Sequence, residues 1–515
     1  MYSGVYGLYD VIVIGSGIGG LTCAAKLAKN GKKVLLLEKM RVIGGTSHIF
    51  KRGEFYFPMG PLSFSYPDLL IEILTELGIE EKIEFRKNNF QLITPLFDIV
   101  YSQPIQELRI SLKKFFTEEQ DGIDKFLDEL EKIMKATVTV HQWHPDYLIG
   151  KKRDNARKNI LLKYKHEFEL IEKYSKIPAK QILEKYISNE ILQNFLGSQG
   201  TYRPKMSMLL LAIMWCLISE KGIWYPSCGM HGINRSIYDT FLNYNGEVKV
   251  ASPVKEILID RNNRVTGVKT IKNEIFESKW VISNADYKRT FLELVDPKKI
   301  PEEYLNVIKD AAFFDSEFCV YLGVDSKKVD LSKIKAQRVY FRKEIKPPEK
   351  FDLEDFDNRE IEISFWSENA RDSAPLEKLT LVLRSGFPYE PFAHWKLGEM
   401  KRKEGYISYK RQLAEKLIKT AENVIPGLSS AIEVMDSGTP LTYEDFSQRF
   451  QGSIAGWSWN VNESKKLPGK LLIETPIENL LMVGMYAASE LFLGGYPTAM
   501  YTGNLAADLV IERSP

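Results

Sequence analysis

The sequence predicts an α/β fold with two domains interleaved along the chain, and three observations support this prediction. The chain has 515 residues, of which 44% are hydrophobic and 27% are charged, so it is long enough to build two cores. A strand, a glycine-rich turn, a helix and a second strand follow one another near the N-terminus. Farther along, Ile105 to Ser219 is rich in lysine, glutamate, leucine and isoleucine at helical spacing.

The N-terminal unit comprises a strand over Asp10–Ile14, a turn over Gly15–Gly20, a helix over Leu21–Asn30 and a strand over Lys33–Glu38. Both strands are continuous apolar runs, which is typical of parallel strands buried on both faces. The sequence therefore predicts a βαβ unit here.

A helical insertion follows, and its periodicity is clearest across Asp121–Lys135 and Lys158–Tyr174. We interpret it as a cap over a substrate site. Within it, Met206–Ile218 is almost entirely apolar but is shorter than the ~20 residues that a membrane-crossing helix needs. That segment is interpreted as a buried core helix, an element that dips into a membrane, or a wall of a lipid tunnel.

Short strands of the first domain are predicted after the helical insertion, and a second sheet and a helix are predicted farther along the chain. Phe313 to Trp395 is expected to supply a second sheet, and Tyr406–Val424 reads as a long amphipathic helix. The short strands of the first domain are Val248–Val250, Val254–Ile259, Val265–Thr270 and Trp280–Ile282.

Bulk composition excludes several classes of protein. A net charge of +2 gives no general attraction to nucleic acid, and the basic stretch Lys151–Lys158 is interpreted as a solvated surface. The four cysteines lack the spacing of a disulfide framework or a metal site, which favours a reducing compartment. No secretory signal is recognised, because the apolar run from Val11 leads directly into glycines. We therefore expect a cytoplasmic protein without a metal.

The turn carries the pattern G-x-G-x-x-G directly after a strand and at the head of a helix, as in a Rossmann-type nucleotide-binding domain. Gly15 permits the tight turn, Gly17 lets the backbone approach a pyrophosphate, and Gly20 allows close helix packing. The next strand ends at Glu38, where a carboxylate can accept hydrogen bonds from an adenosine ribose. This carboxylate disfavours NADP, whose ribose carries a 2′-phosphate, and leaves NAD and FAD.

The residues after Glu38 favour FAD. The segment Arg41–Ser47 resembles the R-x-x-G-G-x-S/T segment of the flavin amine oxidase and phytoene desaturase superfamily. Near the C-terminus, an apolar strand over Asn479–Gly484 precedes Gly494–Ala499 and then a helix that reaches about Arg513. By this resemblance, the free N–H groups and positive dipole end of that helix stabilise reduced flavin.

Three local matches point to one branch, the FAD-dependent phytoene desaturase, carotenoid isomerase and retinol saturase group. Gly44–Phe50 resembles the retinol saturase segment, Thr439–Thr442 resembles a motif of saturases and isomerases, and Tyr225–Gly232 resembles the Y-P-x-G-G-M segment. Two departures stand out. Phe57–Gly60 lacks the usual acidic residue, and Cys228 occupies the place of a paired glycine.

The motifs and the resemblance together define a predicted FAD site. Val254 is expected to pair its backbone with the adenine, and Asn284–Asp286 to return the chain to the cofactor domain. No catalytic acid or base is identified, although His48, His231 and Glu490 lie in or beside cofactor segments. The predicted cofactor-binding residues are Gly15, Ser16, Gly17, Gly19, Gly20, Glu38, Lys39, Arg41, Gly44, Gly45, Thr46, Gly60, Val254, Gly484, Pro497, Thr498 and Ala499.

The resemblance implies an FAD-dependent oxidoreductase that desaturates, saturates or isomerises C–C bonds of a long apolar isoprenoid or carotenoid-like substrate. Trp457, Trp459 and Tyr496 are interpreted as tunnel lining or as core aromatics. An apolar substrate suggests peripheral membrane contact, with Met206–Ile218 as a contact segment between Lys205 and Lys221. The redox partner is not identified.

Two alternatives stay open. A flavin amine oxidase uses the same cofactor scaffold, although no cysteine follows Cys319 for the common C-terminal covalent attachment. A non-catalytic flavoprotein or lipid carrier would bind FAD without turnover. The predicted FAD-binding domain comprises residues 1–100, 222–300 and 437–515, and the α+β substrate domain with its cap comprises residues 101–221 and 301–436.

Overall fold

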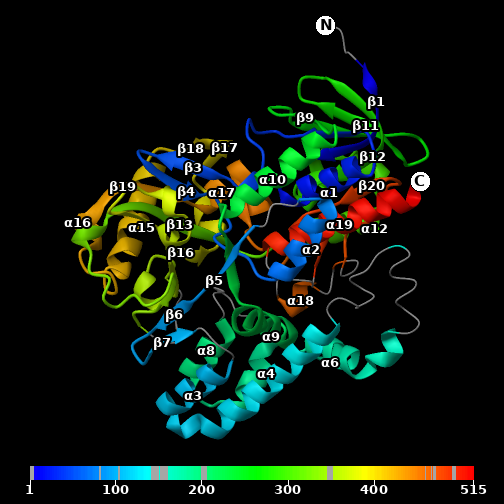
Figure 1. Cartoon of the computed structure of the whole chain (residues 1–515). Helices are drawn as coiled ribbons and strands as arrows, with labels where there is room; N and C mark the ends of the chain where they lie inside the picture. The colour runs from blue at the N-terminus through cyan, green and yellow to red at the C-terminus, as the bar shows by residue number, and fades with distance from the viewer. Residues whose placement is uncertain are drawn as a thin grey trace.

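A computed structural model describes residues 5–79, 83–101, 105–140, 150, 160–198, 206–344, 352–458, 460–464, 467, 471–489 and 495–514. Figure 1 shows three groups of elements: a sheet with helices packed on it at the end where both termini lie, a second sheet beside it, and a cluster of helices below both. The α/β fold predicted from the sequence is confirmed.

The first sheet contains the predicted βαβ unit. Strand β1 (Val5–Ile14) pairs in parallel with β2 (Val34–Leu37) and with β12 (Ile275–Ser283). The strand order is β10-β11-β12-β1-β2-β9, with β20 (Leu480–Met482) paired to β12. Helix α1 (Ile18–Lys29) connects β1 to β2. The remaining strands are β9 (Glu247–Lys249), β10 (Val254–Ile259) and β11 (Val265–Thr270), and the helices around the sheet are α2 (Pro67–Leu77), α10 (Gly229–Asn243), α11 (Tyr287–Arg289), α12 (Glu302–Asp310) and α19 (Gly495–Arg513).

The second sheet has the order β19-β13-β16-β15-β14-β6-β7. Alternation along β13 gives its two faces different roles, because successive side chains point to opposite sides. Phe318, Val320 and Leu322 pack in a core with helix α15 (Tyr406–Ala421), whereas Cys319 and Tyr321 belong to the core of the first sheet. The strands are β6 (Phe90–Ile93), β7 (Asp98–Tyr101), β13 (Ser316–Asp325), β14 (Arg338–Phe341), β15 (Ile361–Phe365), β16 (Lys378–Phe387) and β19 (Ile432–Gly438).

The cluster of helices corresponds to the predicted cap. Its apolar faces meet in one core, and the described part comprises α3 (Ile105–Phe115), α4 (Gln120–Val140), α6 (Lys165–Ser175), α7 (Ala179–Tyr186), α8 (Glu190–Ser198) and α9 (Met208–Cys216). The basic stretch Lys151–Lys158 lies outside the described residues, as does the start of the predicted helix Lys158–Tyr174.

The packing of helix α9 shows the role of the apolar segment Met206–Ile218. Nearly every residue of α9 is buried against neighbouring cap helices, including Leu211 and Ala212 at 0% exposure. The interpretation of this segment as a membrane contact is therefore wrong, because its side chains are already covered by protein. In the part of the chain that the structure describes, no helix is both long and apolar enough to span a bilayer.

Smaller elements connect these groups. The hairpins are β3 (Ile49–Arg52) with β4 (Phe55–Pro58), β5 (Phe85–Asn88) with β8 (Ile223–Pro226), and β17 (Lys396–Gly398) with β18 (Lys401–Arg402). The short helices are α13 (Trp366–Asn369), α14 (Glu390–Ala393), α16 (Leu428–Ala431), α17 (Pro440–Ser447) and α18 (Val461–Ser464).

Candidate functional site

The glycine turn between β1 and α1 is shaped for a phosphate group. Gly15 has φ +92°, and a Cβ on Gly20 would lie only 2.1 Å from the Gly15 carbonyl oxygen, so the turn tolerates no side chain there. Helix α1 begins at Ile18, and no side chain caps its first N–H groups. These free donors and the positive helix dipole point at the turn, as an anion site requires.

The carboxylate of Glu38 is fixed beside this turn. Its Oε2 accepts hydrogen bonds from the Ser16 amide at 2.8 Å and from the Ser16 hydroxyl at 2.6 Å, and its Oε1 accepts from the Met40 amide at 2.8 Å. Oε2 accepts two hydrogen bonds and Oε1 only one, so Oε1 retains a second lone pair for a ribose hydroxyl. Glu38 is 6% exposed, so its orientation is held by these bonds.

Gly19 lies where helices α1 and α19 meet. A Cβ on Gly19 would lie 2.9 Å from the Ala499 carbonyl oxygen, and a Cβ on Gly503 would lie 2.2 Å from the Gly19 carbonyl oxygen. Helices α1 and α19 therefore touch backbone to backbone. This contact brings the start of α19, with Pro497 and Thr498, to the glycine turn.

The paired glycines close the opposite side of the site. The Gly44 amide donates to the Ser16 carbonyl at 3.0 Å, and Gly44 has φ +103°. A Cβ on Gly45 would lie 3.1 Å from the Gly17 Cα, and a Cβ on Gly60 would lie 2.8 Å from the Thr46 carbonyl oxygen. The segments around Gly15, Gly45 and Gly60, far apart in sequence, are thus brought together.

Two asparagines that are not among the predicted cofactor-binding residues connect these segments. A Cβ on Gly17 would lie 2.6 Å from Asn284 Nδ2, and a Cβ on Gly484 would lie 2.8 Å from Asn284 Oδ1. Asn234 of α10 donates to the Gly44 carbonyl at 3.0 Å and accepts from the Tyr496 hydroxyl at 2.8 Å. The position of Asn284 directly after strand β12 is the one sequence signal that could have identified it.

Val254, Lys39 and Arg41 occupy different parts of this region. The Ser252 amide donates to the Glu38 carbonyl at 2.9 Å, which places Val254, the first residue of β10, close to Glu38. Burial lowers the pKa of the Lys39 ammonium, which donates to the Asp445 carbonyl at 3.3 Å. Arg41 is exposed.

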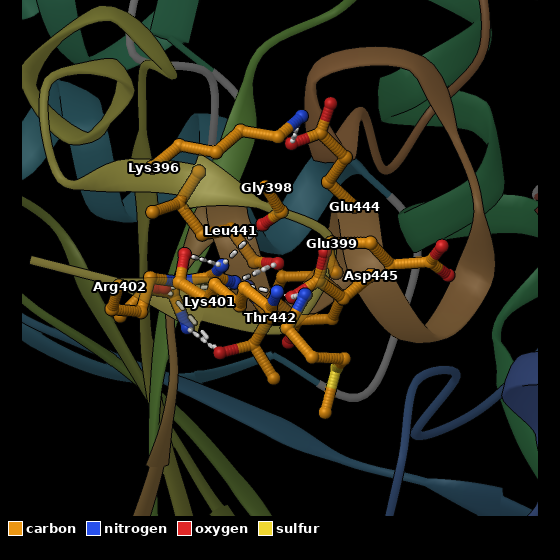
Figure 2. A network of polar contacts seen from close by, with 12 residues as sticks. Lys396, Gly398, Glu399, Lys401, Arg402, Leu441, Thr442, Glu444 and Asp445 are labelled. Carbon is orange, nitrogen blue, oxygen red and sulfur yellow. Dashed lines mark hydrogen bonds and ion pairs between the residues drawn. The ribbon is translucent and has the colours of Figure 1, made fainter.

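Helix α17, which carries the Thr439–Thr442 motif, joins the second sheet to the cofactor segments. Thr439 and Thr442 form a capping box at its start. Figure 2 shows how the β17–β18 hairpin holds the helix: Arg402 binds Asp445, and Lys396 binds Glu444 at 2.8 Å. Both acidic side chains are less than a tenth exposed. Just beyond the helix, Arg449 donates to the Thr46 hydroxyl at 3.2 Å.

Of the predicted aromatic residues, two are structural. Trp457 is 2% exposed, stacks on Phe313 at 5.0 Å and donates to the Tyr486 carbonyl at 2.8 Å, so it is a core residue. Tyr496 is buried, and its hydroxyl donates a hydrogen bond to Asn234. Trp459 and Glu490 lie outside the described residues.

His48 and His231 come from neighbouring elements. Burial lowers the pKa of His48, and burial together with the charge of nearby His48 lowers the pKa of His231. His231 Nδ1 is buried and has no hydrogen-bond partner among the described residues. Both imidazoles are therefore biased toward the neutral form.

The face of the second sheet that is turned from α15 carries a buried ionic network. Arg384 binds Glu362 at 2.6 Å and Glu317 at 3.6 Å, and Arg338 binds Glu362 at 3.1 Å. Burial disfavours the charge of Glu362, but Arg338 and Arg384 outweigh burial and hold its pKa below the usual range. Tyr443 of α17 donates to Glu317 at 2.7 Å. The network lies on the side of the first sheet's core, because Tyr321 on the same face of β13 belongs to that core and packs against Phe50 and Phe57 of the β3–β4 hairpin.

The turn, the fixed carboxylate and the paired glycines fit FAD, since the backbone is bare where a pyrophosphate must approach. Such a fold and site define an FAD-dependent oxidoreductase. Residues 18–511 match the family model described as flavin containing amine oxidoreductase. The chain belongs to this family, and the family predicted from the sequence is confirmed.

Individual relatives refine the comparison. The chain is 28% identical to the chloroplastic prolycopene isomerase of Daucus carota over 98% of its own length and 81% of the relative. It is also 28% identical to the all-trans-retinol 13,14-reductase of Danio rerio, over 98% and 86% of the two chains. Its fold resembles cyclohexylamine oxidase from Brevibacterium oxydans, with TM-score 0.61, 14% identity and coverage of 98% and 99%.

Proposed function

We propose that this protein desaturates, saturates or isomerises C–C bonds of a long apolar polyene of the isoprenoid class. The observation that carries the proposal is the apolar junction between the three groups of elements. Leu69 of α2, Tyr340 of β14, Met214 of α9 and Tyr501 of α19 are partly buried and pack against the cap core. Side chains of this kind suit a substrate without polar groups along its length.

The relatives support the same chemistry. The proteins from Daucus carota and Danio rerio are named for isomerising prolycopene and for reducing all-trans-retinol, and both match nearly the whole chain. FAD, when bound, would supply hydride exchange with a substrate carbon, and the protein would orient the substrate and exclude water. We propose that the seventeen residues predicted from the sequence hold the cofactor, from the glycine turn through Glu38 and Gly44 to the start of α19.

The amine oxidase alternative has less support. Likeness to cyclohexylamine oxidase at 14% identity concerns the fold alone. We keep the predicted division into an FAD-binding and a substrate domain as a proposal, and note that β6 pairs with β14 of the second sheet. Peripheral membrane contact is likewise proposed, because a polyene partitions into lipid; α9 does not supply it.

The test is product analysis with the FAD-loaded protein. Prolycopene and all-trans-retinol in detergent micelles are incubated anaerobically with oxidised and with dithionite-reduced protein. The products are separated by chromatography, and their masses are measured by mass spectrometry. We expect a product that has lost or gained two hydrogens, or an isomer of unchanged mass. Unchanged polyenes in both redox states, with peroxide formed from primary amines in air, would contradict the proposal.

A further inference from the structure

Two polar groups beside the first turn of α10 have no partner among the described residues. The Tyr225 hydroxyl belongs to a side chain with 0% exposure, and His231 Nδ1 is buried. A buried donor or acceptor without a partner costs free energy and calls for an explanation, of which contact with a ligand or a catalytic role is one. The two groups form one site, because both lie next to Gly229.

Gly229 sets the geometry of this site. It has φ +73°, and a Cβ built there would meet His231 Cε1 at 2.7 Å and Nδ1 at 2.8 Å. The Tyr225 hydroxyl lies 3.5 Å from the same point. The imidazole and the phenol therefore lie close together above the backbone of Gly229, which has no side chain to separate them. The Tyr225 ring is fixed by an edge-to-face contact with Trp366, at 5.1 Å between centroids.

The site lies between the segments that the FAD site needs. Asn234, three residues after His231 and so on the same side of α10, binds the Gly44 carbonyl and the Tyr496 hydroxyl. Tyr496 directly precedes Pro497 at the start of α19. Trp366, which contacts Tyr225, lies on the other side of the site. It directly follows β15, the strand that contributes Glu362 to the buried ionic network.

We propose that His231, with Tyr225 as its hydrogen-bonding partner at the substrate, exchanges the proton that accompanies hydride transfer. This proposal rests on the proposed function. In desaturation, one hydrogen leaves carbon as a hydride to oxidised flavin and the other leaves as a proton to neutral His231. The electron pair of the second C–H bond forms the new C=C bond. In saturation, protonated His231 returns the proton to one carbon, and the hydride comes from reduced flavin.

The surroundings suit an imidazole that accepts a proton. Burial and nearby His48 lower the pKa of His231, which keeps it neutral at neutral pH. The other titratable groups near it are Tyr225 from β8, Cys228 at the start of α10 and Tyr496 from α19. Burial raises the pKa of both tyrosines, so they stay protonated and act as hydrogen-bond donors.

The experiment compares H231Q and Y225F with H166Q, a change at an exposed histidine of α6. Flavin content is measured first by absorbance, and turnover of prolycopene and all-trans-retinol is then measured across pH. We expect H231Q to keep its flavin, to lose on the order of 100-fold in turnover and to lose the acid limb of the pH profile. Y225F is expected to lose roughly tenfold, the effect of one hydrogen bond. H166Q is expected to match wild type.

Turnover within about threefold of wild type in H231Q, with an unchanged pH profile, would overturn the proposal. If H231Q fails to hold flavin, H231N replaces it, since the shorter amide keeps a polar group near the Nδ1 position. A pH titration of the flavin spectrum supplies a readout that needs no substrate: wild type and H166Q are expected to show a transition that H231Q lacks. If the wild-type protein converts no polyene, the proposed function is wrong. If H231Q retains the spectral transition, His231 is not a neighbour of the flavin, whatever the substrate is.

Discussion

Glu38 Oε2 accepts hydrogen bonds from both the amide and the hydroxyl of Ser16, at 2.8 and 2.6 Å. The residue that directly follows β2 is thereby fixed to the turn that follows β1. A carboxylate fixed in this way can accept a ribose hydroxyl at Oε1 without losing further freedom on binding.

Removing this carboxylate should weaken FAD binding. We expect E38A to raise the dissociation constant of FAD by roughly 10- to 100-fold, since hydrogen bonds to a charged group contribute about 1.5–3 kcal/mol each. E38Q, which keeps one acceptor, should lose less. Calorimetric titration of the flavin-free protein checks this, with E302A at an exposed position of α12 as the control. Equal affinity of E38A and E302A for FAD would show that Glu38 does not contribute to FAD binding.

The backbone contact between Gly19 and Gly503 should tolerate no added methyl group. We expect G503A to lower the free energy of unfolding by about 1–3 kcal/mol and to reduce flavin retention, because α19 must move away from α1. Chemical denaturation measures the loss. The matched control is G438A, since a Cβ on Gly438 meets its neighbours only at ordinary contact distances of 3.7–3.8 Å.

Breaking the buried ion pair shown in Figure 2 should destabilise the junction between the two sheets. D445A leaves Arg402 buried without its partner, so we expect a loss of about 3–5 kcal/mol in the free energy of unfolding. The comparison is R411A, which breaks the exposed Arg411–Glu415 pair of α15 and should cost less than about 1 kcal/mol. Comparable losses in the two variants would show that the buried pair is not stabilising.

The two half-buried histidines, His48 and His231, should make stability depend on pH in one direction. Their folded-state pKa values lie below the unfolded value of about 6.5, so the unfolded chain binds more protons as the pH falls below that value. The midpoint of thermal unfolding of the FAD-loaded protein should therefore decline below about pH 6.5. The double variant H48Q/H231Q should decline less steeply than H166Q; parallel curves would contradict the assignment.

Local sequence patterns predicted the first sheet closely. Strands β10 and β11 match the predicted Val254–Ile259 and Val265–Thr270, because short strands bounded by turns are local signals. The helix to Arg513 is confirmed as well. Glu38 and the paired glycines were identified because their chemistry depends on short spacing.

Contacts between distant segments were not predictable in the same way. Asn234 and Asn284 contact residues that lie far along the chain, and the sequence predicted these contacts for neither of them, although the resemblance placed Asn284 where the chain returns to the cofactor domain. The role of Gly19 depends on Gly503, which is an ordinary residue of a helix until the two helices cross. Likewise, Met206–Ile218 has the composition of a membrane contact, and only the packing of the cap shows that its side chains are covered.

The most direct test of the central claim is to identify what the purified protein binds. The protein is denatured, and the released small molecules are examined by absorption spectroscopy and mass spectrometry. We predict released FAD together with a polyene or prenyl lipid. A colourless protein that cannot take up added FAD would contradict the account.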